Sequence, residues 1–276
     1  MKELSQIISY SLPLLYLLVI YIYYLIFSGR NKSLVNKTTP ILLILIICHI
    51  IEMVTRNIAL STMPLSTTHD AYAFIAFSIL LVYMISELGL NNRGAGLFIL
   101  SFSLVLELLS AINMSWQPET NELLTNKTFA IHASLSITGY TALSLAAIYA
   151  LMYIIQNNNL KKRNLGKLFM QLPALTYLEK MSMRSVVTGI ILLGIGLFLG
   201  HYQALVNPQI GVFFPNDMKV IISDAVWILY IGGLIVTNIK KWRGEKMAYM
   251  SLYGFIILIV GGGIIIYMSE SFHKFN

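Results

Sequence analysis

The sequence predicts an all-α fold, a polytopic membrane helix bundle of about eight transmembrane helices. Hydrophobic residues fill 57% of the 276 positions and charged residues only 11%, whereas a soluble domain has roughly a quarter charged. The mean hydropathy is +0.74. Eight apolar runs, each near the ~20 residues that cross a hydrocarbon layer, follow one another. They cover residues 7–27, 40–60, 72–90, 95–112, 129–155, 185–205, 220–239 and 248–268. Together they predict one transmembrane domain over residues 1–276.

The connections between these runs differ strongly in basic residues. Lysines and arginines concentrate in the first, third, fifth and seventh connections, which hold Arg30, Lys32, Lys37, Arg93, Lys161, Lys162, Arg163, Lys167, Lys180, Arg184, Lys240, Lys241, Arg243 and Lys246. The opposite side holds Lys2, Lys127, Lys219 and Lys274. Because cytoplasmic loops are enriched in Lys and Arg, this bias predicts cytoplasmic odd connections and both termini outside. The net charge of +7 therefore needs no nucleic acid to explain it.

The first apolar run, two polar segments and the single cysteine carry further expectations. Residues 7–27 are followed by no small-residue cleavage site, so we expect a retained helix rather than a signal peptide. Residues 157–184 mix basic and apolar side chains, which predicts a segment lying at the inner membrane interface. Residues 200–227 form a polar break with His, Asp, Lys and aromatic side chains, and its part 200–219 is the expected site element. The single Cys48 leaves no disulfide framework, CxxC pair or CxxCH motif.

The five histidines are distributed unevenly over this topology. Those expected near the outer face are His69, His132, His201 and His273. His49 lies ten residues beyond Pro40, which places it ~15 Å deep, about mid-bilayer. Imidazole is the commonest protein ligand for haem iron, and imidazoles gathered at one bundle end could hold an iron from two sides. The neighbouring Tyr202, Phe213 and Phe214 could pack a porphyrin. The alternative is an ordinary interfacial belt of polar and aromatic residues.

A polar stripe lies inside the second predicted helix. His49, Glu52 and Arg56 are spaced i, i+3 and i+7, so they share one helix face. Ionisable groups in hydrocarbon are costly unless they are paired or solvated, and they normally face the bundle interior. One interpretation is a structural Glu52–Arg56 ion pair with His49 as a hydrogen-bond partner. The other makes His49 a ligand within the membrane.

Six longer strings resemble those of a known family, in the same order and over most of the chain. They are CHIIEMVTRNI (48–58), MPLSTTHDAYAF (63–74), IHASLSITGYTALSLAAIYAL (131–151), LPALTYLEKMSMRSVVTGIILLGIGLFLG (172–200), FFPNDMKVIISDAVWILY (213–230) and KWRGEKMAYMSLYGF (241–255). The ordered set resembles the haem-handling cytochrome c assembly superfamily of the CcsA, CcmC and HemX types. The short form with a WRG-type inner loop most resembles the YpjD/HemX-like branch.

The resemblance implies an outer-face site for haem b, bound non-covalently between two axial histidines. His132 matches the first ligand by its place in IHASLSITGY, and His273 matches the second through SFHKF after the last helix. His201 is the substitute for His273. His49 matches the family's first membrane-embedded histidine.

Residues of the predicted outer connection match the family's Trp-rich signature in part. Asp217 and Lys219 match its Asp and Lys, and Trp227 matches the Trp of the following helix. By this resemblance Lys219 would pair with a propionate and Asp217 would orient a ligand or Lys219. The chain departs from the pattern at Phe213, Phe214 and Asn216 in place of tryptophans, at Met218 and Val220 in place of Pro and Glu, and at Ile235 in place of a second embedded histidine.

The function that follows is haem binding at the outer face by a chaperone of the cytochrome c assembly type rather than by a stand-alone catalyst. The expected partners are haem, an apocytochrome c or a second membrane assembly protein, and membrane lipid, with no nucleic acid. The expected location is a bacterial inner membrane. Three alternatives stay open: a cofactor-free membrane regulator of haem biosynthesis of the HemX kind, a b-type electron-transfer subunit, and a small-molecule transporter. A b-type subunit commonly needs paired histidines on shared helices, and the sequence offers one mid-membrane histidine.

Overall fold

The described part of the protein is entirely helical, which confirms the predicted all-α class. The computed structural model describes residues 2–61, 65, 67–88, 93–116, 127–163, 166, 169, 172–206 and 218–272. Within these residues it has eight α-helices and one 3₁₀ helix. They are α1 (Lys2–Phe27), η1 (Lys32–Lys37), α2 (Thr38–Leu60), α3 (Thr68–Glu87), α4 (Gly96–Ile112), α5 (Lys127–Lys161), α7 (Leu175–Val206), α9 (Met218–Ile239) and α10 (Glu245–Phe272).

The lengths and hydropathies of these helices suit a membrane. Among the residues described, six helices are long and apolar enough to cross one. They are Lys2–Phe27, Ser33–Leu60, Thr68–Ser86, Lys127–Lys161, Leu175–Val206 and Val220–Ile239. The apolar helix α4 is shorter, with 17 residues. The chain is an integral membrane protein.

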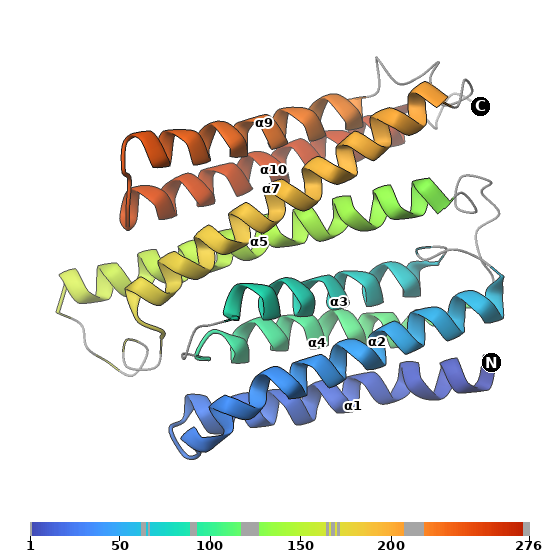
Figure 1. Cartoon of the computed structure of the whole chain (residues 1–276), viewed down its shortest axis with the longest axis horizontal. Coiled ribbons are helices and arrows are strands. Elements are labelled where there is room, and N and C mark those ends of the chain that lie inside the picture. The colour runs from blue at the N-terminus through green and yellow to red at the C-terminus, as the bar shows by residue number, and fades with distance from the viewer. Residues whose placement is uncertain are drawn as a thin grey trace.

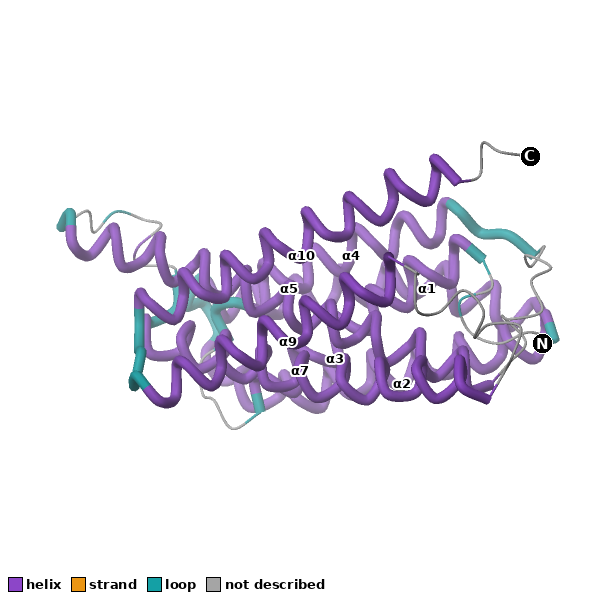
Figure 2. Tube along the Cα trace, turned by 90° about the horizontal axis from the view of Figure 1, so that it is seen from above, coloured by secondary structure: helices purple, strands orange, loops and turns teal. Residues whose placement is uncertain are grey.

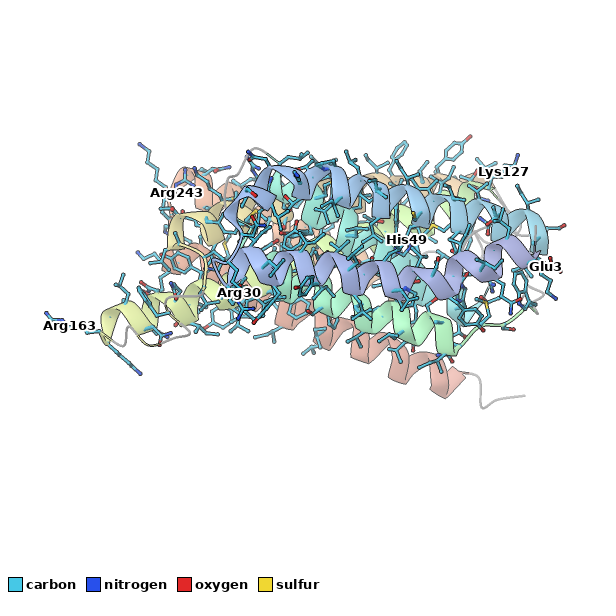
Figure 3. The ribbon with its side chains drawn as sticks, turned by 90° about the horizontal axis from the view of Figure 1, so that it is seen from below. Glu3, Arg30, His49, Lys127, Arg163 and Arg243 are labelled. Carbon is cyan, nitrogen blue, oxygen red and sulfur yellow. The ribbon has the colours of Figure 1, made fainter. Side chains whose placement is uncertain are left out.

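The helices run up and down along one long axis (Figures 1 and 2). Helices α1 to α4 form one half of the bundle, and α5, α7, α9 and α10 form the other (Figure 1). Figure 3 shows Arg30, Arg163 and Arg243 at one end, which we call the basic end, while Glu3 and Lys127 lie at the opposite, distal end. The basic residues therefore segregate as the sequence predicts. That the basic end faces the cytoplasm stays a prediction.

Helix α3 begins with a cap that also fixes a functional side chain. The Thr67 hydroxyl accepts a hydrogen bond from the backbone N–H of Asp70 at 3.2 Å. Such a cap satisfies one of the N–H groups that a helix start leaves unpaired. It brings Asp70 into the first turn of α3, next to the end of α2, where Ser61 adopts a left-handed conformation with φ 55°. The turn between α2 and α3 thus sets the geometry of the polar residues described below.

The segment 157–184, expected at the inner membrane interface, contains the end of one helix and the start of another. Helix α5 continues to Lys161, and α7 begins at Leu175 rather than near Ser185. The first turns of α7 are amphipathic, because Tyr177, Leu178 and Met181 are buried while Lys180 is exposed. Burial of that apolar face stabilises the extra turns, and the basic side chains reach water at the bundle end.

Helices α5 and α7 approach each other closely along faces of small residues. A Cβ added at Gly139 would lie 2.7 Å from the backbone nitrogen of Leu193, and one added at Gly196 would lie 2.6 Å from the hydroxyl of Ser136. Small residues are favoured at membrane helix contacts because they let backbones pack closely. This contact positions the distal parts of both helices, which carry two of the predicted site histidines.

Candidate functional site

His132 lies in the second turn of α5, against the backbone of α7. Its Nδ1 is 2.6 Å from the carbonyl oxygen of Gly196, and a Cβ added at Gly200 would lie 2.7 Å from its Cε1. Gly196 and Gly200 are one turn apart and together make the surface on which the imidazole rests. The ring position therefore depends on the absence of a side chain at Gly200 and on the backbone carbonyl of Gly196.

This contact determines the tautomer of His132. A carbonyl oxygen only accepts hydrogen bonds, so Nδ1 carries the proton and donates it, which leaves the lone pair on Nε2. Within the part of the chain that the structure describes, Nε2 has no hydrogen-bond partner. Histidine ligands of metals are usually held in this way, with one nitrogen donating to a backbone carbonyl and the other available to the metal.

His201 is held differently. Its Nδ1 lies 2.8 Å from the carbonyl oxygen of Leu197, and its Nε2 lies 3.2 Å from a carboxylate oxygen of Asp224 on α9. Both ring nitrogens of His201 therefore already have a partner within hydrogen-bonding distance, unlike the Nε2 of His132 within the described residues. As a ligand, His201 would first have to leave Asp224.

The other predicted site residues of this end divide into those described and those not. Trp227 on α9 donates its indole N–H to the carbonyl of Ile190 on α7 at 2.9 Å, so it fixes α9 to α7. Tyr202 is 52% exposed on α7. Lys219 lies in the first turn of α9, but its side chain is outside the described part, and Phe213, Phe214, Asp217 and His273 lie outside the described residues. Of the expected element 200–219, residues 200–206 belong to α7 and residues 218–219 to α9.

A second group of polar side chains lies inside the α1–α4 half, and we call it the polar column. Its members are Ser9, Tyr16, His49, Glu52, Arg56, His69, Asp70, Ser103, Glu107 and Ser110, and among these the ionisable side chains are at most 9% exposed. They come from four helices and meet across the α1–α4 interior. Charged groups buried in a membrane normally pair with one another or mark a site.

The distal layer of the polar column is an ion pair that the sequence did not predict. Arg56 pairs with Asp70, so the expected Glu52–Arg56 pair is wrong. The guanidinium also donates to the hydroxyl of Thr67 at 3.2 Å and to the carbonyl of Ser115. Its Cζ lies 4.9 Å from the ring centroid of Trp116, within cation–π range. The capping turn of α3 presents Asp70 to Arg56, whereas Glu52 turns to other partners.

The middle layer joins Glu52 to His69. The Nε2 of His69 is 3.3 Å from Oε1 of Glu52, and the hydroxyl of Ser9 lies 2.7 Å from the same oxygen. The Nδ1 of His69 contacts Ser110, at 2.9 Å from its carbonyl and 2.8 Å from its hydroxyl. His69 is therefore not a residue of an outer connection, as the sequence predicted, but a 1% exposed part of α3.

The inner layer surrounds His49, which Figure 3 shows between the two ends of the bundle. The hydroxyl of Tyr16 lies 3.0 Å from Nε2 of His49 and accepts a hydrogen bond from Ser103 at 3.1 Å. Oε2 of Glu107 lies 3.9 Å from the same Nε2. Both Nδ1 of His49 and Oε2 of Glu107 are buried without a hydrogen-bond partner in the described part of the chain.

The surroundings of His49 leave no space for a porphyrin. The imidazole is 0% exposed, and its ring centroid lies 5.6 Å from that of Tyr16 and 5.8 Å from that of Phe77. A planar macrocycle could reach the ring only if α1, α3 and α4 separated. We therefore do not assign His49 as a haem ligand.

Three carboxylates that the sequence did not mark as site residues, Glu107, Asp70 and Asp224, contact the predicted histidines and arginine. Glu107 is the sole charged residue of the predicted run 95–112, and Asp224 is the sole charged residue of the run 220–239. A lone ionisable residue in an apolar run was the available signal for each. Over the residues that the structure describes, no group of three or more His, Cys, Asp or Glu could hold a metal ion.

Comparison with known proteins identifies the family. Residues 7–273 match the family model described as Cytochrome C assembly protein. Protein HemX of Bacillus subtilis (strain 168) is 29% identical over 153 residues, which cover 55% of this chain and 54% of that protein. Cytochrome c biogenesis protein CcsA of Guillardia theta is 24% identical over 304 aligned residues, covering 99% of this chain and 92% of that protein.

The extent of these matches differs between the two kinds of relative. Protein HemX of Brevibacillus brevis is 28% identical over 148 residues, again 54% of that protein, so the chain spans about half the length of the HemX proteins it matches. No solved structure matches the chain. The family model, in contrast, covers nearly the whole sequence, and the protein therefore belongs to the cytochrome c assembly protein family.

Proposed function

We propose that the protein binds haem b non-covalently at its distal end, at the outer face of the membrane, and holds it for transfer to an apocytochrome c or to a partner membrane protein. The observation that carries this proposal is the orientation of His132. The carbonyl of Gly196 holds Nδ1–H at 2.6 Å, so the Nε2 lone pair is available to an axial position of iron. Family membership supports the same kind of role.

The second axial ligand in this proposal is His273 rather than His201. Asp224 holds the Nε2 of His201 at 3.2 Å, and breaking that contact would leave a carboxylate without its partner. His273 follows α10, whose last residue is Phe272 at the distal end (Figure 1). Both axial groups would then come from the same end of the bundle, from α5 and from the residue after α10.

Three further side chains would shape the site around the macrocycle. Lys219 lies in the first turn of α9, where its ammonium would pair with a propionate, as a cation does with a carboxylate. Trp227 contributes indirectly, because its bond to Ile190 fixes α9 against α7. Tyr202 offers an exposed aromatic ring near His201. The haem supplies iron chemistry, and the protein controls its ligation and access.

The experiment that tests this proposal is absorption spectroscopy of the protein purified in detergent, with and without added haem. A Soret band that titrates to one haem per chain is expected. Absence of haem uptake by folded protein contradicts the proposal and favours a cofactor-free regulator or a transporter. Two haems with separate potentials contradict it in favour of an electron-transfer subunit. The enclosed position of His49 argues for a single haem.

A further inference from the structure

The polar column reaches from the distal end of α2 to the middle of the bundle, in three layers about one helical turn apart. On α2 the layers are marked by Arg56, Glu52 and His49, so the column extends over seven residues, ~10 Å at 1.5 Å per residue. We propose that this column is a proton pathway, which connects the distal face of the protein with the buried pair His49 and Glu107 and ends there. The proposal does not depend on haem binding.

A small cavity opens the column at its distal side. It has a volume of ≈ 10 Å³ and is lined by Glu52, Arg56 and Asp70, with Asn57 and Leu65 toward the end of α2. A polar cavity of ~10–15 Å³ holds about one water molecule. A water there would touch the carboxylates of both the distal and the middle layer. The middle layer is therefore within one water molecule of the distal end.

Charge balance requires a proton at the inner end. Arg56 and Asp70 neutralise each other, and Glu52 faces His69. Glu107, 1% exposed, has no guanidinium or ammonium partner among the contacts of the described residues, and its nearest basic group is His49 at 3.9 Å. An uncompensated carboxylate at this depth costs several kcal/mol. The pair Glu107 and His49 therefore carries one proton, on the carboxyl or on the imidazole.

The geometry supplies both positions for that proton. In one form Glu107 is a neutral acid and the Tyr16 O–H donates to Nε2 of His49 at 3.0 Å. In the other form the Tyr16 O–H turns to the carbonyl of Ala76 at 3.4 Å, and the Glu107 side chain first closes its 3.9 Å gap to Nε2 of His49 to hydrogen-bond distance. The O–H bond of Glu107 then breaks as an N–H bond forms at Nε2. The products are a carboxylate and an imidazolium, so the net charge of the pair is unchanged.

The middle layer is placed to exchange that proton with the distal face. One proton lies between Nε2 of His69 and Oε1 of Glu52, since two lone pairs would otherwise face each other at 3.3 Å. On α2, Glu52 lies three residues, ~4.5 Å along the helix axis, from His49, the neighbour of Glu107. A proton that reaches Glu107 from Glu52 would be replaced at Glu52 through His69 or the cavity water. Every step moves a proton only, so no oxidant or reductant is required.

The polar and ionisable groups around the inner and middle layers come from all four helices of this half. Helix α1 presents Ser9 and Tyr16, α2 presents Glu52, α3 presents His69 beside Asp70, and α4 presents Ser103 together with Glu107 itself. Helix α5 packs on another face of α3, where the hydroxyls of Ser78 and Thr138 lie 3.1 Å apart. Glu52 and His69 therefore lie in the layer next to the inner pair, and Arg56 and Asp70 lie one layer further toward the distal end.

An apolar layer closes the column toward the basic end. Its members are buried to 4% exposure or less: Val19, Leu42, Leu45, Leu80 and Leu100. It separates the inner layer from Tyr23 and Tyr83, whose ring centroids lie 6.1 Å apart. Tyr16 and Tyr23 are seven residues apart on α1, so the layer is ~10 Å thick. Protons would reach Glu107 from the distal side and would not cross the membrane.

Infrared spectroscopy of the full chain in lipid nanodiscs tests the pathway. The carbonyl stretch of a protonated carboxylic acid is expected in the wild type at neutral pH and should disappear in Glu107→Gln. Asp224→Asn is the matched control, because Asp224 is an intramembrane carboxylate in the other half of the bundle, and that variant should keep the band. Equal intensity of this band in the wild type and in Glu107→Gln, across the whole pH range in which both stay folded, overturns the proposal.

The direction of access is tested by transfer into D₂O, which shifts the band as the site exchanges. His69→Gln keeps size and hydrogen bonding but cannot relay a proton, so exchange should slow by roughly 100-fold. Tyr83→Phe, beyond the apolar layer, should leave the rate unchanged. Unaltered exchange in His69→Gln, or equal slowing in Tyr83→Phe, contradicts a distal pathway. Should His69→Gln not fold, as judged by circular dichroism, Ser9→Ala is expected to slow exchange, and an unchanged rate there overturns the pathway.

Discussion

The guanidinium of Arg56 pairs with the carboxylate of Asp70 on the neighbouring helix, although Glu52 lies one turn away on its own helix. The reason is the start of α3, where the Thr67 cap fixes Asp70 directly opposite Arg56. Glu52 is thereby left to His69 and Ser9. The i, i+4 spacing on α2 predicted Glu52 as the partner of Arg56, but the packing of α3 against α2 brings Asp70 to the guanidinium instead.

A double-mutant cycle should measure this choice of partner. Asp70→Asn leaves Arg56 buried without its counter-charge, and breaking such a pair costs ~3–5 kcal/mol. We expect a large coupling energy between Arg56→Gln and Asp70→Asn in thermal or denaturant unfolding in detergent. Coupling between Arg56→Gln and Glu52→Gln should be smaller, ~0.5 kcal/mol or less, because those side chains share no direct contact. A larger coupling energy for Arg56 with Glu52 than for Arg56 with Asp70 would show that Arg56 pairs with Glu52.

Replacement of His132 tests the axial ligand. In His132→Gly we expect haem with one open axial position, because the imidazole that Gly196 orients has been removed. Added imidazole should restore the six-coordinate spectrum by filling that position. Optical and electron paramagnetic resonance spectra of the reconstituted variant provide the measurement.

Two other histidine variants serve as comparisons for this prediction. His201→Gly should keep its six-coordinate spectrum, since Asp224 holds that imidazole away from iron. His69→Gln should alter stability but not the haem spectrum, because the side chain lies inside the polar column. Imidazole rescue of His201→Gly, or a normal spectrum of His132→Gly, would show that the ligand assignment is wrong.

Gly200 should be as sensitive as the histidine that it supports. A methyl group there would lie 2.7 Å from Cε1 of His132, so Gly200→Ala must displace the ring. We expect haem affinity to fall at least about tenfold, which corresponds to ~1.4 kcal/mol. Gly232→Ala is the matched control on α9, because nothing lies within 4 Å of its added Cβ.

The Gly232→Ala control also distinguishes displacement of the His132 ring from a general loss of bundle stability. Gly232→Ala should retain haem affinity and melting temperature, while Gly200→Ala should lose affinity with its helical content preserved. Equal losses in both variants would mean that the affinity reports bundle stability and not the support of His132.

Membrane orientation is open to cysteine labelling. In a Cys48→Ala background, Lys127→Cys marks the distal start of α5 and Lys161→Cys marks its basic end. Fourteen basic residues in the odd connections predict that the distal end is outside. An impermeant maleimide should label Lys127→Cys in intact cells and Lys161→Cys only after permeabilisation. Labelling of both positions from one side contradicts the up-and-down arrangement.

Much of the fold was predictable, because hydrophobic length alone identifies helices that cross a membrane. The eight runs correspond to the eight described α-helices, and the confirmed family follows from strings such as IHASLSITGY around His132. The boundaries were less accurate where polar ends continue a helix into water, as at Leu175. The mean hydropathy of an amphipathic turn is low because its basic face offsets its apolar face, so hydropathy does not assign such a turn to the helix.

For the polar column, the sequence predicted a shared helix face but not the contacts of its residues. Spacing placed His49, Glu52 and Arg56 on one face of a helix, and they do line the interior. Their partners Glu107, Asp70 and Tyr16 come from three other helices, and only the packing of α1, α3 and α4 against α2 brings them together. The hydrogen bond between His132 and the Gly196 carbonyl is also a tertiary contact, between α5 and α7, and neither sequence segment alone predicts it.

Helix α5 is longer than a membrane is thick. Its 35 residues extend ~52 Å, against a hydrocarbon core of ~30 Å, and Figure 3 shows Arg163, just beyond its end, projecting past the other helices. At that tip Lys161 is tied to Glu245 of α10 at 2.6 Å. Because α5 is one continuous helix, a displacement or tilt of its projecting end is transmitted to His132 without an intervening loop. A partner that binds the projecting end would therefore change the position of the imidazole at the opposite end of the bundle.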